Sequence, residues 1–166
     1  MVLLSIGYGI VIAYIAYLIN SNFLNLFDVD FRIYSKYYAP IIEEVLKVTF
    51  IIFLITRSKV GFLVDSAILG YSVGAGFSFF ENIFYLQLLS TESPALWIVR
   101  GFGTAIMHGG AVAIFAIISM NNINKGVKNI LAIYIPSFIA CYLIHSIYNH
   151  FRSEERRVGK ECRSRW

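Results

Sequence analysis

The stretch APIIEEVLKVTFIIFLIT, residues 39–56, combines an apolar run long enough for a membrane helix with three charged side chains. Glu43, Glu44 and Lys47 are spaced so that the lysine can reach both glutamates from one helix face. Pro40 is tolerated at a helix start, where its missing N–H would have no helical partner. Inserting a charged side chain into a bilayer costs about 2.5 to 3.5 kcal/mol, so such a residue is expected to have a partner or a function. The stretch predicts a membrane helix that carries polar chemistry.

Four further apolar runs flank this stretch, at about 2–19, 62–89, 95–120 and 130–151. Each run is close to the roughly 20 residues that a spanning helix needs. Hydrophobic residues make up 58% of the 166-residue chain and charged residues 14%, which excludes an ordinary soluble domain. The sequence therefore predicts an all-α membrane protein, a polytopic helical bundle with about five transmembrane helices. We expect the first helix to end at the polar residues Asn20, Ser21 and Asn22.

The last fifteen residues, 152–166, read RSEERRVGKECRSRW and equal the translation of a common short-read sequencing adapter. They hold six of the 14 basic residues and three of the 10 acidic ones, so most of the net charge of +4 lies there. We expect a non-native tail, with a genuine polybasic segment that attracts anionic lipid as the alternative. The domain is then residues 1–151, and we expect the natural gene to continue beyond it. The charge that remains predicts no nucleic-acid partner.

Basic residues in the short connections predict the orientation, because lysine and arginine resist translocation. Arg57 and Lys59 lie between the second and third runs, and Lys125 and Lys128 lie between the fourth and fifth. The opposite side offers two basic residues, which two aspartates dilute. Five spans then place the N-terminus in the cytoplasm.

The third run contains a further buried acid in the segment GAGFSFFENIFY, residues 74–85. Glu81 has no basic residue at helical spacing, so its partner must come from another helix. Gly70, Gly74 and Gly76 allow a neighbouring helix to come close. The simpler interpretation of Glu81 is a structural hydrogen bond between helices.

Two histidines lie inside the fourth and fifth runs, His108 and His145. Counting about 1.5 Å of rise per residue from the outer helix ends places the three glutamates and both histidines about 6 to 18 Å deep, all in the outer half. Side chains from four helices can therefore converge on one polar site. The simpler interpretation is a helix-dipole role for the acids after Pro40 and interhelical hydrogen bonding for the histidines.

The ordered set of motifs resembles the PrsW family of intramembrane proteases, which is more distantly similar to CAAX prenyl endopeptidases. The motifs are EExxK, DxxxxG, GFxxxENxxY, an Arg followed by a His, and HxxxN. In order, they fall on Glu43, Glu44, Lys47, Asp65, Gly70, Gly76, Phe77, Glu81, Asn82, Tyr85, Arg100, His108, His145 and Asn149. They cover residues 39–151 and leave the first run without a motif. The resemblance implies a multi-pass endopeptidase of the bacterial cell membrane that cleaves single-span, membrane-anchored proteins such as anti-sigma factors.

Peptide hydrolysis needs a base for the attacking water and donors for the oxyanion. Adjacent glutamates cannot both ionise cheaply, so one can hold a proton for the leaving amine while Lys47 fixes which one stays ionised. The histidines would donate to the oxyanion. We therefore predict catalytic roles for Glu43, Glu44, Glu81, His108 and His145, with support from Lys47, Phe77, Asn82, Arg100 and Asn149.

The cofactor prediction depends on the spacing of the histidines. The chain has no HExxH pair on one helix, so we expect metal-free chemistry in which a glutamate activates water. A divalent metal such as zinc, held by Glu81, His108 and His145, is the alternative.

Two other functional classes keep acids and histidines inside a membrane protein. A proton- or cation-coupled transporter does so at mid-membrane, and a non-catalytic scaffold could keep histidines for packing. The sequence shows no inverted repeat, and it keeps the glutamate pair that a scaffold would be expected to lose. These features favour the protease.

Overall fold

The structure is a computed structural model, which describes the backbone of residues 1–88 and 94–163 and the side chains of residues 1–84, 98 and 100–151. The regular elements within these ranges are all helical. In order they are α1 (Val2–Leu26), α2 (Phe31–Ile33), the π-helical segment η1 (Tyr34–Tyr38), α3 (Ala39–Thr56), α4 (Leu63–Leu88), α5 (Pro94–Asn124) and α6 (Ile130–Arg163). The predicted all-α bundle is confirmed, and its five long helices coincide with the five apolar runs.

Four of the long helices have both the length and the composition to cross a membrane. The matching segments are Val2–Leu26, Leu63–Phe84, Arg100–Asn124 and Ile130–Phe151. The fifth, α3, is 18 residues long and differs from the others by its three charged side chains. Because α3 contacts all four other long helices, these side chains can be covered by protein instead of lipid.

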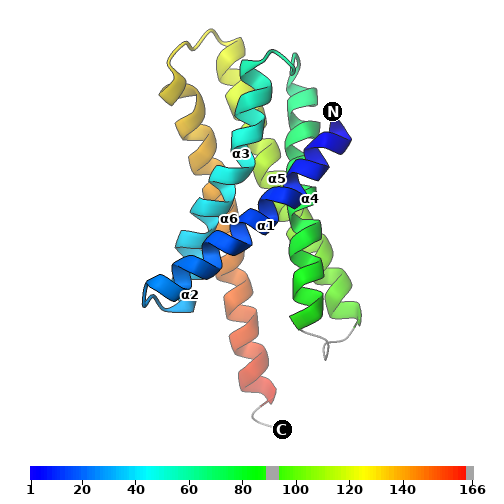
Figure 1. Ribbon diagram of the computed structural model, residues 1–166, viewed down its shortest axis with the longest axis vertical. Coiled ribbons are helices and arrows are strands. Elements are labelled where there is room, and N and C mark those ends of the chain that lie inside the picture. The colour runs from blue at the N-terminus through cyan, green and yellow to red at the C-terminus, as the bar shows by residue number, and fades with distance from the viewer. Residues whose placement is uncertain (89–93, 164–166) are drawn as a thin grey trace.

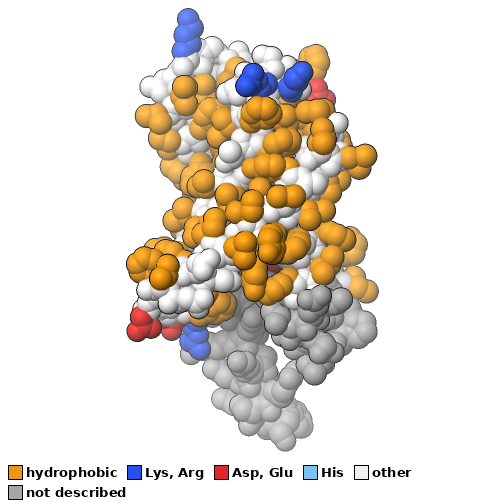
Figure 2. All heavy atoms as spheres, viewed as in Figure 1, with side chains coloured by type: hydrophobic (Ala, Val, Ile, Leu, Met, Phe, Trp, Pro, Cys, Tyr) orange, Lys and Arg blue, Asp and Glu red, His pale blue; other side chains and the backbone are white. Residues whose placement is uncertain are grey.

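The helices form a bundle in which α4 packs between α1 and α5, and α6 packs against α5 (Figure 1). Helix α1 crosses the bundle obliquely in this view. Figure 2 shows hydrophobic side chains over most of the described face, with Lys and Arg side chains at the end that holds the α3–α4 and α5–α6 connections. An apolar girdle with charges at its ends is the surface that a bilayer requires.

Glycines set the distance between α4 and its two neighbours. A Cβ atom on Gly74 would overlap the backbone of α5 at His108, and one on Gly76 would overlap the backbone of α1 at Ile6. Gly9 of α1 has the reciprocal role, because its Cβ would overlap the carbonyl of Val73. The close helix approach predicted from the glycines is therefore confirmed.

Helix α1 is longer than predicted. The expectation that it ends at Asn20 to Asn22 was wrong, because the helix continues to Leu26. Asn22 stays within the helix by donating to the carbonyl oxygen of Leu18, at 2.9 Å. Asn20 turns inward, where its side chain finds partners on η1 and α3. Polar side chains end a helix only when they compete with the backbone, and here their hydrogen bonds are met without unwinding it.

Candidate active site

A group of ionisable side chains meets between α3, α4, α5 and α6. We call it the polar cluster, and it consists of Glu43, Glu44, Lys47, Glu81, His108 and His145. Glu44 and Lys47 are fully buried, and the two histidines nearly so. The side chains of Glu43 and Glu81 are 15% and 24% exposed, so two carboxylates reach the edge of the cluster. All five residues predicted to be catalytic are thus within it.

The Glu44 carboxylate accepts hydrogen bonds from three side chains. Its Oε1 accepts hydrogen bonds from Lys47 Nζ and His145 Nδ1, each at 2.7 Å. Its Oε2 accepts from the thiol of Cys141 at 2.9 Å. Three donors hold this carboxylate in its ionised form and fix its orientation.

The hydrogen bonds also determine which nitrogen of each histidine carries the proton. An ammonium can only donate, so Nδ1 of His108 accepts from Lys47 at 2.7 Å. Nε2 of His108 then carries the hydrogen and donates to Glu81 Oε2 at 2.8 Å. His145 donates from Nδ1 to Glu44, which leaves its Nε2 lone pair 3.9 Å from Glu43 Oε2. Glu81 thus has the partner from another helix that the sequence required.

Phe77 and Cys141 complete the walls of the polar cluster. Lys47 Nζ lies 3.8 Å from the centre of the Phe77 ring, and that ring lies 5.0 Å from the His108 ring. The aromatic face stabilises the buried ammonium. Cys141 was missed by sequence reasoning, although it lies one helical turn before His145 and so shares its face of α6.

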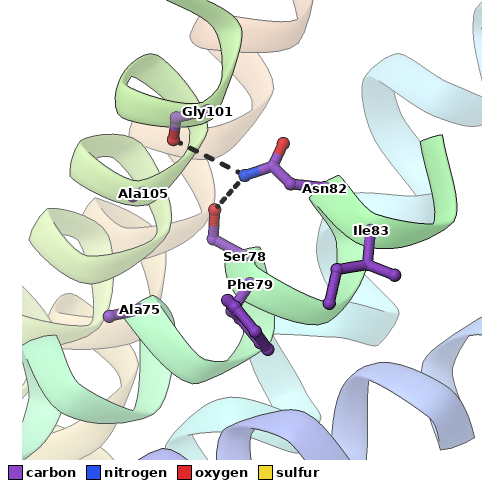
Figure 3. A pocket seen from close by; sticks show the side chains of 7 residues that line it. All are labelled: Ala75, Ser78, Phe79, Asn82, Ile83, Gly101 and Ala105. Carbon is purple, nitrogen blue, oxygen red and sulfur yellow. Dashed lines mark hydrogen bonds between the residues drawn. The ribbon is translucent and has the colours of Figure 1, made fainter. Parts of the chain in front are cut away.

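The remaining predicted supporting residues lie elsewhere. Asn82 donates to Thr104 Oγ1 at 2.9 Å and to Ser78 Oγ at 3.1 Å. Figure 3 shows its further hydrogen bond to the carbonyl oxygen of Gly101, at 3.5 Å, so Asn82 joins α4 to α5. Asn149 donates to the carbonyl oxygen of Ser35 at 2.9 Å and so joins α6 to η1. Both amide side chains therefore join neighbouring helical elements.

Two other motif residues are Arg100 and Tyr85. Arg100 lies one turn before Thr104, and its carbonyl oxygen accepts from the Thr104 hydroxyl at 3.0 Å. The side chain of Tyr85 lies outside the described residues.

A cavity of about 350 Å³ lies between α4 and α5. Figure 3 shows Asn82 and Ser78 at its wall, opposite Gly101 of α5. Its other lining residues are Ala75, Phe79, Ile83 and Ala105, so the wall is mostly apolar and contains no member of the polar cluster. The polar cluster and this cavity are therefore separate features of the bundle.

Three members of the polar cluster could hold a metal ion. Ligand atoms of Glu43, His108 and His145 all lie within 4.8 Å of one another. This set differs from the predicted one, in which Glu81 was the third ligand. Two histidines and one glutamate form a common catalytic zinc set. The hydrogen bond between His145 Nδ1 and Glu44 is of the kind that orients a metal-ligating histidine.

The net charge of the polar cluster also fits a divalent metal ion. Three carboxylates and one ammonium leave two negative charges when every acid is ionised. Such an excess is costly in a buried site unless protons, a divalent cation or a basic group outside the cluster balances it. The donor set and the charge both fit a divalent metal.

Comparison with known families identifies the chain. The model of the PrsW family, described as intramembrane metalloproteases, matches residues 1–160. The chain belongs to the PrsW family. The resemblance seen in the motifs is thereby confirmed, and PrsW membership makes the protein a peptide hydrolase of the membrane. No curated protein and no solved structure matches the chain.

The PrsW match includes helix α1, which carries none of the motifs quoted above. It also makes the chain a multi-pass membrane protein whose substrate is expected in the membrane. The match is to a family and assigns no role to any single residue.

Proposed function

We propose that this protein cleaves single-span membrane proteins of the anti-sigma-factor type in a bacterial cell membrane, with water activated by a glutamate. The observation that carries the proposal is the convergence of three carboxylates, an ammonium and two histidines in the interior of an apolar bundle. Buried charges of this kind are costly and are retained for chemistry or for transport. Membership in a protease family favours chemistry.

The two adjacent glutamates have different roles in this proposal. Glu44 is buried and its oxygens already accept three hydrogen bonds, so it has little capacity left for a water. Glu43 is partly exposed and accepts one longer hydrogen bond, from Asn20 at 3.3 Å. Glu43 is therefore the general base, which takes a proton from water and passes it to the leaving amine.

The oxyanion of the tetrahedral intermediate needs a positive charge or a free N–H group. The predicted histidine donors do not suit this role, because the hydrogen of His108 is given to Glu81 and that of His145 to Glu44. Lys47 is the ammonium of the polar cluster and lies 3.7 Å from Glu43 Oε2. We assign oxyanion stabilisation to Lys47.

A divalent metal would be held by Glu43, His108 and His145. When bound, such an ion polarises the scissile carbonyl and makes a water acidic enough to attack at neutral pH. To ligate through Nδ1, His108 would have to release the hydrogen bond that it accepts from Lys47. The second hydrogen bond of each histidine, to Glu81 or to Glu44, would then fix the ring for ligation.

The experiment that tests the function is cleavage of a defined reporter. The reporter has one apolar helix of about 20 residues between two fluorescent domains, and it is reconstituted with the protein in vesicles. We expect two fragments whose formation requires Glu43. Cleavage that survives a chelator supports Glu43 as the base, and cleavage that is lost and restored by zinc supports the metal group. A reporter that stays whole under both conditions contradicts the proposal.

Metal binding by this group can be measured without any substrate. We expect Co²⁺ to give visible absorption bands with the purified protein, because two imidazoles and a carboxylate can surround it. His145→Phe should abolish these bands. His150→Phe is the matched control on the same helix, because His150 lies near Tyr37 and outside the polar cluster. Bands of equal strength in both variants would exclude the assigned ligands.

The side of the membrane on which cleavage occurs follows from the orientation. If the connections with Arg57 and Lys125 are cytoplasmic, the N-terminus is cytoplasmic and the polar cluster is nearer the outer surface. The reporter should then be cut near its extracytoplasmic boundary.

Cysteine labelling tests this orientation directly. With Cys162 replaced by Ser and Cys141 buried, an impermeant thiol reagent outside the cell should label Asp28→Cys and leave Ser58→Cys unlabelled. Both positions are exposed. Asp28 precedes α2 and Ser58 follows α3, so the two connections lie at opposite ends of α3. The opposite labelling pattern would place the polar cluster toward the cytoplasm.

A further inference from the structure

Glu43 is the least constrained carboxylate of the glutamate pair. Lys47 Nζ and His145 Nε2 approach its Oε2 only to 3.7 and 3.9 Å, which is too far for hydrogen bonds. Among the described side chains, Asn20 is the one within hydrogen-bonding distance, with Nδ2 at 3.3 Å from Oε1. The orientation of the Glu43 carboxylate therefore depends on a residue of α1.

Asn20 is itself held by a second residue. The hydroxyl of Tyr34 donates to Asn20 Oδ1 at 2.7 Å. An amide that accepts through its oxygen on one side must present its NH₂ group on the other, and here that side faces Glu43. Tyr34 is only 2% exposed, so water does not compete for this hydroxyl.

The π-helical segment η1 fixes the position of Tyr34. Pro40 follows this segment and has no N–H to give to the carbonyl groups four and five residues earlier. Those two carbonyls, of Lys36 and Ser35, instead accept hydrogen bonds from Ser146 and Asn149 of α6 at 2.8 and 2.9 Å. Single π-helical turns of this kind occur frequently at functional sites.

Aromatic side chains also pack η1 against α1. The ring of Phe23 lies 5.1 Å from that of Tyr34 and 5.9 Å from that of Tyr38. The Tyr34 and Tyr38 rings are nearly parallel, with centres 6.2 Å apart. Contacts from α1 and α6 thus hold the segment that carries Tyr34, and the position of its hydroxyl is fixed.

We propose that Asn20 and Tyr34 are positioning residues, which aim the Glu43 carboxylate at the attacking water. This inference rests on the proposed function, in which Glu43 is the base. It makes α1 and η1 part of the active site, although neither element carries a recognised motif. A misplacement of a reacting group by about 1 Å can reduce a rate 10²-fold, so even one orienting hydrogen bond matters.

The test compares kcat and KM for the single-span reporter in four forms of the full chain. These are the wild type, Asn20→Leu, Tyr34→Phe and the double variant. We expect Asn20→Leu to lower kcat by about 10- to 100-fold with KM within about twofold. Tyr34→Phe should lower kcat by a smaller factor. It should have no further effect in the Asn20→Leu background, because the tyrosine acts through the asparagine.

Two matched variants measure the effect of structure alone. Asn22→Leu changes an exposed asparagine on the same helix, whose amide bonds only to its own helix. Tyr38→Phe removes a hydroxyl from the ring that stacks on Tyr34. Both should keep kcat within about twofold. If Asn20→Leu does not accumulate, Asn20→Asp keeps the size of the side chain, replaces the donating NH₂ group with an oxygen and adds a negative charge beside Glu43, so it should lose at least as much kcat.

Three outcomes would overturn the positioning role. These are wild-type kcat in both Asn20→Asp and Tyr34→Phe, a change confined to KM, and additive losses in the double variant. The proposed function has a separate control, since it fails when Glu43→Gln still cleaves the reporter. An inactive Glu43→Gln beside a fully active Asn20→Asp would therefore reject the positioning role alone.

Discussion

Glu43→Gln should abolish cleavage of the reporter while the protein folds and inserts normally. Glutamine keeps the shape of the side chain and its hydrogen bond from Asn20 but cannot take a proton from water. Loss of a general base typically costs about 10²- to 10⁴-fold in rate. Thermal unfolding in detergent should be unchanged, because Glu43 is partly exposed and few groups depend on it. Initial rates of fragment formation and the unfolding temperature are the two measurements.

Glu44→Gln provides the internal comparison for this result. Glutamine has one acceptor oxygen, whereas Glu44 accepts from Lys47, His145 and Cys141. At least one buried donor is left without an acceptor, at a cost of about 1 to 3 kcal/mol, so this variant should lose stability as well as activity. Asp28→Asn, in an exposed connection, should change neither. Cleavage at the wild-type rate by Glu43→Gln would remove Glu43 from the mechanism.

Gly74→Leu should prevent the bundle from assembling. A side chain at this position would overlap backbone atoms of α5 at His108 and Gly109, which cannot rotate away. Even Gly74→Ala should destabilise the protein by about 3 kcal/mol, which corresponds to a fall of roughly 10 °C in unfolding temperature. Because the contact is with the backbone of His108, the alanine variant should also lose cleavage activity. Thermal unfolding and the reporter assay measure the two effects.

Gly110 is the matched control for this prediction. It lies on α5 beside Gly109, and a Cβ atom there would meet nothing within 4 Å. Replacing a helical glycine by alanine gains about 1 kcal/mol in helix propensity, so Gly110→Ala should be neutral or slightly stabilising. If Gly74→Ala were equally stable, the α4–α5 approach would be looser than the structure shows.

The sequence by itself determined the helices and their polar residues. The apolar runs are long enough to span a bilayer, and a helix is the only open-ended element that satisfies its own backbone there. Charged side chains in such runs must find partners, so the meeting of Glu43, Glu44, Glu81, His108 and His145 could be predicted without coordinates. Their catalytic roles stay a proposal.

The tertiary structure decided which partners these groups take. Helical spacing allows Lys47 to reach either glutamate, and only the packing of α5 and α6 gives it to Glu44 at 2.7 Å. The expected metal ligand Glu81 is hydrogen-bonded to His108, and the group whose ligand atoms lie within 4.8 Å of one another contains Glu43 in its place.

Contributions from outside the motifs could not be found in the sequence. Asn20 was expected to lie at the end of the first helix, and Tyr34 belongs to none of the motifs. Their hydrogen bonds join residues that are 14 and 23 positions apart, on three different elements. Helical periodicity says which residues share one helix face, but not which face of another helix that surface will meet. That pairing depends on side-chain packing across the whole bundle, where glycines such as Gly74 set how closely the helices approach.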